Sequence, residues 1–413
     1  MDATSFGLFH ESSVWHDSAR RSIGDLQVKA KIVPITLDNL SAVAEITKKY
    51  GFPRSERWIR RLLFDPNVPE GHDRDSRGAL IVSDKGESVG IYCWAPCSIY
   101  LRQERKSAYI GALLGVDKKY SPWILDAIDM NTAEIAGRFS YGNDCASKVA
   151  FKFWSGFGVK WGPEDGDVSD SWRPGLCPLS YALINHPLWR IGIKAHWLAT
   201  VVYWLTSPFQ ILNEAIRGFA TSVARLLGFG CKWSFKEEKG FSDERFMPFW
   251  KRFLATNEGL ISSREPATLR WKFDESIQAE AVTLISAERD GQVDGYILLR
   301  RNPANGTPAA EYGVCDICAV GNDVECLNAL LKAALRYCRR KLAFRLTYVG
   351  APRDKDKWIV KNCFHRQSKL VCNPFSYSCK DEEILKAAQE NRGWFFGPYD
   401  GERCLGYGRY IDL

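Results

Sequence analysis

The sequence has few of the residues and patterns that would place it in a catalytic class at once. Its 413 residues contain six histidines, and no two of them stand at the spacing of a zinc site. It has no G-x-S-x-G nucleophile elbow, no P-loop and no Rossmann glycine fingerprint. RNP, zinc-finger and helix-turn-helix signatures are missing as well, which argues against nucleic acid as a partner. The chemistry must therefore be sought in the order of the secondary-structure elements.

A secretory signal is also missing, since Met1 to Asp25 is polar and has no apolar core. We therefore expect a cytoplasmic protein whose thirteen cysteines are reduced thiols. Cys315 and Cys318 form a C-x-x-C, but they lie in a strand-like run, where positions three apart point to opposite faces. No second pair follows at metal-site spacing, so the sequence favours buried structural cysteines and no metal site.

Strong charge of one sign is missing too. The chain carries 56 Lys and Arg against 49 Asp and Glu, a net charge of +7, and 46% of its residues are hydrophobic. This composition is that of an ordinary, mildly basic globular protein. It allows an anionic partner, such as a nucleotide cofactor or a membrane surface, without choosing between them. The length predicts two or three domains, because single cores stop growing near ~250–300 residues.

What the sequence does contain is one order of strands and helices that occurs twice. After a polar lead-in at residues 1–29, the first half is predicted to run strand, two helices, hairpin, strand, helix and strand. The second half repeats this order, with a hairpin turning at Asp290-Gly291. A repeat this long indicates a duplicated domain rather than a solenoid. We predict an α/β (α+β) fold of two tandem domains, residues 30–180 and 236–413, with mixed, mostly antiparallel sheets flanked by helices.

The segment between the two copies, residues 181–235, is rich in tryptophan and other apolar residues. Its most apolar stretch, Trp197 to Leu212, is too short for a span of ~20 residues, and Pro208 interrupts it. Basic residues flank it: Arg190, Lys194, Arg217 and Arg225. The pattern of residues 187–229 predicts either a helix lying in the plane of a membrane or a buried helical pair that packs the copies together. A transmembrane span is the third and less favoured interpretation.

The first half ends in YGNDCASKVAFKFWSGFG, and the chain closes with RGWFFGPYDGE. With the order of elements, these motifs resemble the GNAT superfamily of N-acetyltransferases, in particular the tandem-GNAT proteins of bacterial polysaccharide gene clusters. The resemblance covers about residues 30–165 and 240–400. The first motif is similar to the family's strand exit, and the second to a terminal pattern common in such tandem proteins. The matching positions are Tyr141, Asn143, Ser147 and Phe157 in the first motif and Trp394, Pro398 and Asp400 in the second.

The resemblance implies an acyl-coenzyme A cofactor, acetyl-CoA or another, in a gap where each sheet splays beside its fourth strand. The pyrophosphate would meet backbone N–H groups at the start of the next helix. In the first copy this loop reads VDKKYSPWI, while in the second it reads VGNDVECL, whose Asp323 and Glu325 would repel phosphate. Neither loop has the family's full glycine-rich motif. If one copy binds the cofactor, its charges favour the first copy. The implied cofactor residues are Val116, Lys118, Lys119, Ser121, Asn143, Ser147 and Phe157.

The same resemblance implies a base that deprotonates an amine and an acid, often Tyr, that protonates the leaving thiolate. No Tyr stands at the expected place in the last helix of the first copy. Tyr141, Tyr120 and Asp117 are the nearby substitutes, and Tyr348 and Asp316 are counterparts in the second copy.

These features predict an acyl-CoA-dependent N- or O-acyltransferase that acts on a saccharide or lipid-linked precursor, in the cytoplasm and peripheral to the inner membrane. Two alternatives stay open. One is a catalytically silent tandem-GNAT scaffold, which the incomplete phosphate loops and the missing Tyr would fit. The other is a Fem-type aminoacyl transferase, which shares the duplicated architecture and uses aminoacyl-tRNA.

Overall fold

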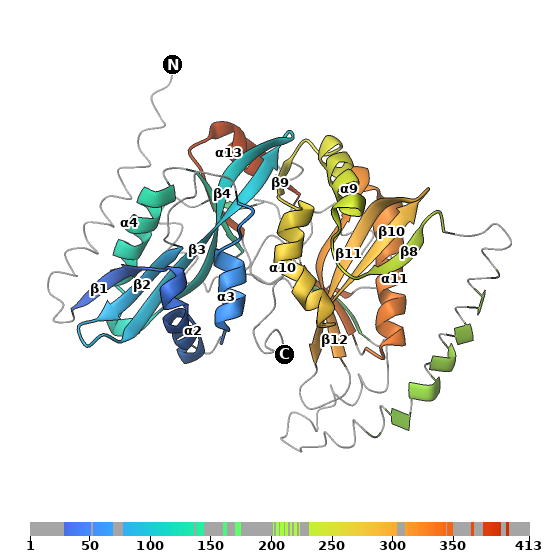
Figure 1. The fold of residues 1–413 in the computed structure, drawn as a ribbon, viewed down its shortest axis with the longest axis horizontal. Coiled ribbons are helices and arrows are strands. Elements are labelled where there is room, and N and C mark those ends of the chain that lie inside the picture. The colour runs from blue at the N-terminus through green and yellow to red at the C-terminus, as the bar shows by residue number, and fades with distance from the viewer. Residues whose placement is uncertain are drawn as a thin grey trace.

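The chain forms two mixed sheets with helices on their faces, as Figure 1 shows. The predicted α/β fold is thereby confirmed. The structure is a computed structural model and describes the following residues: 29–50, 53–68, 77–135, 138–143, 160–162, 170–174, 231–303, 310–343, 345–349, 365–366, 375–389 and 394–395, with scattered positions between 201 and 223.

The first sheet has the strand order β1-β2-β3-β4-β5-β15-β6, with β9 and β16 attached at the side of β3. Helices α2 (Leu40–Lys49) and α3 (Glu56–Leu63) pack on one face, and α4 (Trp123–Ile135) packs on the other. Neighbouring strands are antiparallel from β1 to β4, and β4 and β5 are parallel. The strands supplied by the first half are β1 (Ala30–Pro34), β2 (Gly78–Ser83), β3 (Ser88–Leu101), β4 (Glu104–Val116), β5 (Phe139–Asn143) and β6 (Lys160–Gly162).

The second sheet repeats this order as β8-β10-β11-β12-β13-β7-β14. Helices α9 (Asp243–Ala255) and α10 (Pro266–Gln278) cover one face, and α11 (Val324–Arg340) covers the other. The hairpin predicted at Asp290-Gly291 is confirmed, since both residues have positive φ, as a tight turn of this kind requires. The strands supplied by the second half are β8 (Ser234–Glu238), β10 (Val282–Arg289), β11 (Gln292–Pro303), β12 (Ala310–Ala319), β13 (Arg345–Val349) and β14 (His365–Arg366).

Each half also gives a strand to the interior of the other half's sheet. Strand β15 (Phe375–Ser378), near the end of the chain, lies between β5 and β6 in the first sheet. Strand β7 (Asp170–Pro174), from the first half, lies between β13 and β14 in the second sheet. The boundaries predicted at residues 180 and 236 therefore do not separate the two sheets, because each sheet contains a strand from the other side of the boundary.

A third crossing joins the halves along β3. Strand β9 (Leu260–Ser262), from the second half, pairs with Ile99 and Tyr100 of β3, and β16 (Trp394–Phe395) pairs with β9. The Trp271 indole N–H donates to the carbonyl oxygen of Arg61 at 3.0 Å. Trp394, from the closing motif, thus lies beside the first sheet, while Pro398 and Asp400 lie outside the described residues.

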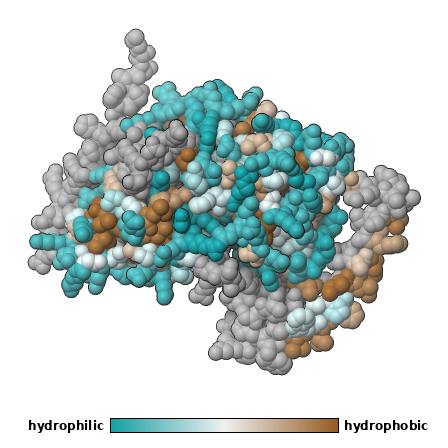
Figure 2. All heavy atoms as spheres, in the orientation of Figure 1, coloured by the Kyte–Doolittle hydropathy of each residue, from teal (hydrophilic) through white to brown (hydrophobic). Residues whose placement is uncertain are grey.

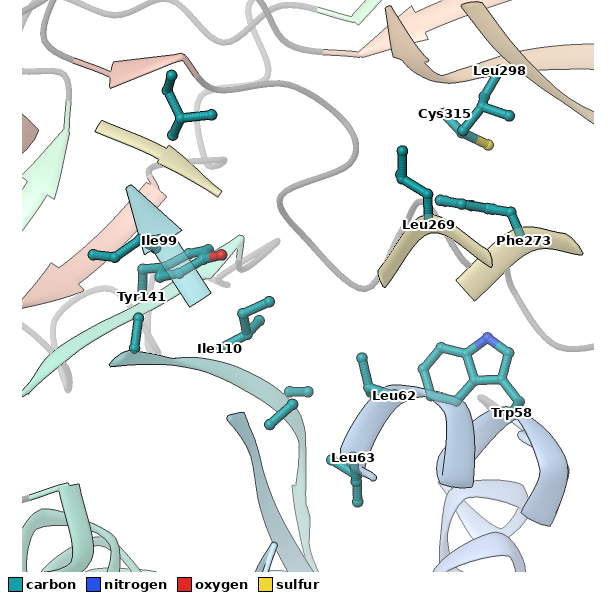
Figure 3. Close-up of a cluster of buried hydrophobic side chains, with 14 of the residues drawn as sticks. Trp58, Leu62, Leu63, Ile99, Ile110, Tyr141, Leu269, Phe273, Leu298 and Cys315 are labelled. Carbon is teal, nitrogen blue, oxygen red and sulfur yellow. The ribbon is translucent and has the colours of Figure 1, made fainter. Parts of the chain in front are cut away.

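One hydrophobic core runs through both halves beneath a largely hydrophilic surface, which Figure 2 shows on one side of the molecule. Figure 3 shows side chains of this core from both sheets, with the α3 and α10 residues between them. Because burial of apolar surface drives folding, a core shared in this way makes each half part of the other's stability. The labelled members are Trp58, Leu62, Leu63, Ile99, Ile110, Tyr141, Leu269, Phe273, Leu298 and Cys315.

Helix α3 begins with a serine cap. The Ser55 hydroxyl accepts a hydrogen bond from the backbone N–H of Trp58 at 3.2 Å. We expect Ser55→Ala to lower the free energy of unfolding by about 1 kcal/mol, because the first turn of α3 loses its acceptor. Urea unfolding followed by circular dichroism measures this, and Ser55→Thr, which keeps an oxygen, should cost less. Equal losses in the two variants would contradict the capping role.

Candidate functional site

The fourth and fifth strands of the first sheet separate after a short parallel pairing. Strands β4 and β5 pair only over Ala108–Ile110 and Phe139–Tyr141, while β4 continues to Val116. Gly111 follows the last pair. Among the described residues, and apart from its chain neighbours, a methyl group there would have only the Tyr141 carbonyl oxygen within 4 Å, at 3.7 Å. The described residues therefore leave space on the face of β4 where its pairing with β5 ends.

A β-bulge follows this point. The pairing of β3 with β4 shifts by one residue, so that Leu113 is the extra residue, and its φ is 45°. Beyond it, Leu114 is 38% exposed. The bulge re-aims the end of β4 toward the loop that precedes α4, which is the loop that the resemblance assigns to a pyrophosphate.

The second sheet repeats the divergence and the bulge. Strands β12 and β13 pair only over Glu311–Gly313 and Arg345–Thr347, and Cys315 is the extra residue opposite Leu298 and Leu299. The register thus matches Leu114 of the first sheet with Asp316 of the second. The splay expected beside the fourth strand is present in both sheets.

The bulge also corrects one expectation about the cysteines. Cys315 and Cys318 were predicted to point to opposite faces, but both side chains lie in the core cluster on the α9 and α10 side. The extra residue shifts the alternation of the strand, so this prediction is wrong. Burial raises the pKa of the Cys315 thiol, which makes it a poor nucleophile and a poor ligand. In the described part of the chain no cluster of His, Cys, Asp and Glu is fit to hold a metal ion.

The loop after β4 presents positive charge next to the start of α4. Lys118, Lys119 and Ser121 are exposed, and Val116 is half-buried. Trp123 is the first residue of α4, and its buried indole N–H has no hydrogen-bond partner among the described residues. A buried donor without an acceptor costs free energy, so an oxygen-bearing ligand beside it would be stabilising.

Asp117 is held away from this helix start. Its carboxylate accepts from the Lys49 ammonium at 2.7 Å and from the Tyr50 hydroxyl at 3.3 Å, both at the end of α2. Burial first, and then the Asp117 charge, raise the pKa of Tyr50, so its hydroxyl stays protonated and donates. Asp117 therefore ties the loop to α2 and does not compete for an anion at α4.

The three residues predicted as catalytic do not come together. Tyr120 packs on the α4 face of the first sheet, with Lys119 above its ring at 4.9 Å. Tyr141 lies on the opposite face, where its hydroxyl is 2.9 Å from the Ser262 hydroxyl and accepts from the Cys97 thiol at 3.8 Å. Asp117 is ion-paired at the end of β4. Their catalytic roles stay predictions, and Tyr141 is the one next to the diverging strands.

The other predicted cofactor residues are placed only in part. Asn143 ends β5 and pairs with Phe375 of β15, so the exchanged strand runs directly beside it. Ser147 and Phe157 lie outside the described residues. No sequence pattern predicted that a segment from the end of the chain would border this position.

The corresponding helix of the second sheet, α11, is capped by the side chain of its own N-cap residue. The Asp323 carboxylate accepts from the backbone N–H groups of Glu325 at 2.8 Å and Cys326 at 3.2 Å. Glu325 in turn pairs with Lys232 at 2.8 Å. The N–H groups that would hold a phosphate therefore already bind a carboxylate, and a second anion there would be repelled.

A buried polar cluster lies on β12 of the second sheet, at the bulge that follows its pairing with β13. Asp316 is buried and paired with Arg264, Nε to Oδ2 at 2.9 Å and Nη2 to Oδ1 at 3.3 Å. The Tyr296 hydroxyl donates to the same carboxylate at 2.7 Å, and burial first, then Asp316, raise the pKa of Tyr296. Asp316 was a counterpart candidate from the sequence, whereas Arg264 was missed. In the first sheet the matching position is the partly exposed Leu114.

Comparison with solved structures gives the same fold in acyltransferases. N-myristoyltransferase from Saccharomyces cerevisiae, with bound myristoyl-CoA, matches 84% of this chain and 77% of its own at a TM-score of 0.51 and 11% identity. GCN5-related N-acetyltransferases match with TM-scores of 0.52 for the one from Anabaena variabilis and 0.51 for the one from Kribbella flavida. The first covers 87% of this chain and 75% of its own at 11% identity, the second 88% and 74% at 13%. No protein-family model and no curated protein matches the chain.

Proposed function

We propose that the chain is an acyl-CoA-dependent N- or O-acyltransferase that binds acetyl-CoA or another acyl-CoA between β4 and β5. The observation that carries this proposal is the contrast between the two helix starts. Asp323 caps α11 with its own carboxylate, while Asp117 is turned toward Lys49 and leaves α4 flanked by lysines. The lysines of the first loop therefore favour a phosphate-bearing cofactor, whereas Asp323 and Glu325 of the second would repel one. The bound myristoyl-CoA of a protein with this fold supports the cofactor class.

The residues present fit the parts of such a cofactor. Lys118, Lys119 and the Trp123 N–H would meet the pyrophosphate, and the pantetheine arm would lie along β4 and β5, beside Gly111 and Asn143. The cofactor supplies an activated thioester. The chain would hold the thioester carbonyl beside the acceptor amine or hydroxyl, so that the new C–N or C–O bond forms as the C–S bond breaks.

Tyr141 is our candidate for the acid that protonates the leaving thiolate. A tyrosine hydroxyl has a reference pKa of about 10 and is neutral near pH 7, so it has a proton to give. Tyr141 stands at the last paired position before the strands diverge, and Ser262 fixes its hydroxyl. Asp117 would serve as a positioning residue through Lys49 and Tyr50.

The acceptor we propose is a saccharide or a lipid-linked precursor at the cytoplasmic membrane face. The tandem-GNAT resemblance supports the saccharide, and the segment between the halves supports the membrane. The capped start of α11 in the second sheet favours a silent scaffold, but the exposed lysines at the start of α4 count against it for the whole chain. Copurification of tRNA with the full chain would favour the Fem-type alternative.

Calorimetric titration of the full chain with coenzyme A and with acetyl-CoA tests the proposal. We expect one site per chain, and about tenfold weaker binding in Asn143→Ala, because a hydrogen bond to the cofactor is lost. Val349→Ala is the matched control, since Val349 lies two residues after the last paired position of β13, as Asn143 does in β5, and this variant should bind like the unchanged chain. Release of free thiol on adding an amino sugar would then show turnover. If the chain bound no acyl-CoA, the proposed acyltransferase would be wrong, and the silent scaffold would be the remaining interpretation.

A further inference from the structure

A chain of buried hydrogen bonds joins the two sheets at the end of β9. The Ser262 hydroxyl lies 2.9 Å from the Tyr141 hydroxyl of the first sheet. The Ser262 carbonyl oxygen accepts from Arg264 Nη1 at 3.1 Å, and Arg264 pairs with Asp316 of the second sheet. All four residues are buried, so water competes little for these hydrogen bonds.

The backbone around Ser262 explains how one short segment reaches both sheets. Ser262 pairs with Ile99 of β3, which fixes it against the first sheet. Strand β9 ends there, and α10 begins at Pro266, so the chain turns between the two elements and Arg264 reaches the second sheet. Figure 1 shows β9 between the two sheets. A shift of Arg264 is therefore passed on to Ser262 over two residues of backbone.

The ion pair at the far end of this chain fixes a direction more than it adds stability. Two buried charges must be taken out of water, and apolar residues of similar volume often replace such a pair at no loss of stability. Arg264 bonds Asp316 through two nitrogens and the Ser262 carbonyl through the third. Because the guanidinium is planar and rigid, the Asp316 carboxylate sets the place of the Ser262 backbone.

We infer that the second half positions the candidate acid of the first half, with Ser262 as the positioning residue and the Arg264–Asp316 pair as its support. The inference rests on the proposed function, in which Tyr141 protonates the leaving thiolate. In that step the C–S bond breaks with its electron pair on sulfur, and the Tyr141 proton moves to the sulfur. The proton that the acceptor loses then restores Tyr141 through solvent.

The hydroxyl of Ser262 suits this task because it can donate as well as accept. While the Tyr141 oxygen carries negative charge, a hydrogen bond from Ser262 stabilises it and holds its ring in place. The second half thereby takes part in the reaction, although the start of its own helix α11 is capped by Asp323.

Fluorine NMR of the full chain labelled with fluorotyrosine tests the linkage without any turnover. The Tyr141 signal is the one that is lost in Tyr141→Phe. We expect this signal to shift in Ser262→Ala, which removes the hydroxyl beside it. It should also shift in an apolar triple variant of the distant cluster, because Ser262 then loses its support. The triple variant combines Arg264→Met, Asp316→Leu and Tyr296→Phe.

Ser263→Ala is the matched control for Ser262→Ala. Ser263 is also buried, but its hydroxyl accepts from the backbone N–H of Glu265 at 3.4 Å, so this variant should leave the Tyr141 signal in place. A Tyr141 signal that stays in place in the triple variant would overturn the inference. An equal shift in Ser263→Ala would do the same, since it would mean that any change in this segment moves Tyr141.

Steady-state kinetics with acetyl-CoA and an amino sugar test the catalytic consequence. We expect Ser262→Ala and the triple variant each to lower kcat about tenfold with KM for acetyl-CoA unchanged, because the hydrogen bond strengthens only as charge develops on Tyr141. Combining them should cost no more than Ser262→Ala alone, since both act through one hydrogen bond. Ser263→Ala should leave both constants unchanged.

Additive losses in kcat, or a rise in KM in place of a fall in kcat, would contradict the positioning role of Ser262. An unchanged chain without turnover would be a different result. It would count against the proposed function, whereas the Tyr141 signal would still decide whether the second half positions this residue.

Discussion

Lys118→Glu combined with Lys119→Glu is expected to weaken binding of coenzyme A by about 100-fold or more. Each lysine would donate a charge-assisted hydrogen bond to the pyrophosphate, and the two new carboxylates would repel it. Both lysines are exposed beside the start of α4, so the fold should not change. Calorimetry measures the affinity, and a salt series should show that the loss shrinks as ionic strength rises.

The second sheet supplies the matched control for this charge reversal. Lys232 stands beside the start of α11, where it pairs with Glu325. Lys232→Glu should leave coenzyme A affinity unchanged, because Asp323 already occupies the N–H groups of that helix. An equal loss in both variants would mean that long-range charge, rather than the first loop, controls binding. A loss in Lys232→Glu alone would move the site to the second sheet.

Asp316→Ala is expected to lower the free energy of unfolding by about 3–5 kcal/mol. The substitution leaves the Arg264 guanidinium buried without its counter-charge, and it removes the acceptor of the Tyr296 hydroxyl. Equilibrium unfolding in urea, followed by circular dichroism, measures the loss. The binding of coenzyme A to the folded protein should persist, because this ion pair lies in the second sheet.

A variant that removes the whole polar group separates a lost ion pair from a lost packing contact. Arg264→Met, Asp316→Leu and Tyr296→Phe together leave no unpaired charge, so the triple variant should be much closer to the original stability than Asp316→Ala alone. A triple variant as unstable as the single one would show that the shape of this core, and not the charge balance, sets the cost.

Local patterns in the sequence were sufficient for the main elements of each half, up to β5 in the first and β13 in the second. The turn at Asp290-Gly291 and the cap at Ser55 are set by neighbouring residues, so they could be predicted. The loop with Lys118 and Lys119 was found in the same way, because it follows an apolar strand. The comparison with known folds then confirmed the GNAT-like architecture.

Contacts between distant residues could not be predicted. The Arg264 and Asp316 pair is separated by 52 positions and the Lys49 and Asp117 pair by 68. Nothing in the sequence near either member names its partner. The bulge at Cys315 changes the facing of a strand by one residue, which an alternating pattern does not reveal. The exchanged strands are short, and a short strand carries no signal of the sheet that it joins.

The exchange of strands fixes the order in which the protein can be completed during synthesis. Strand β5 ends at Asn143, but its neighbour β15 begins only at Phe375, so the candidate cofactor site acquires this neighbour only after strands β6 to β14 have been synthesised. Pairing over such a separation is slow, because a large loop must close first. The enzyme we propose would therefore gain its activity only as a whole, and a gene split between the halves would have to yield two fragments that find each other.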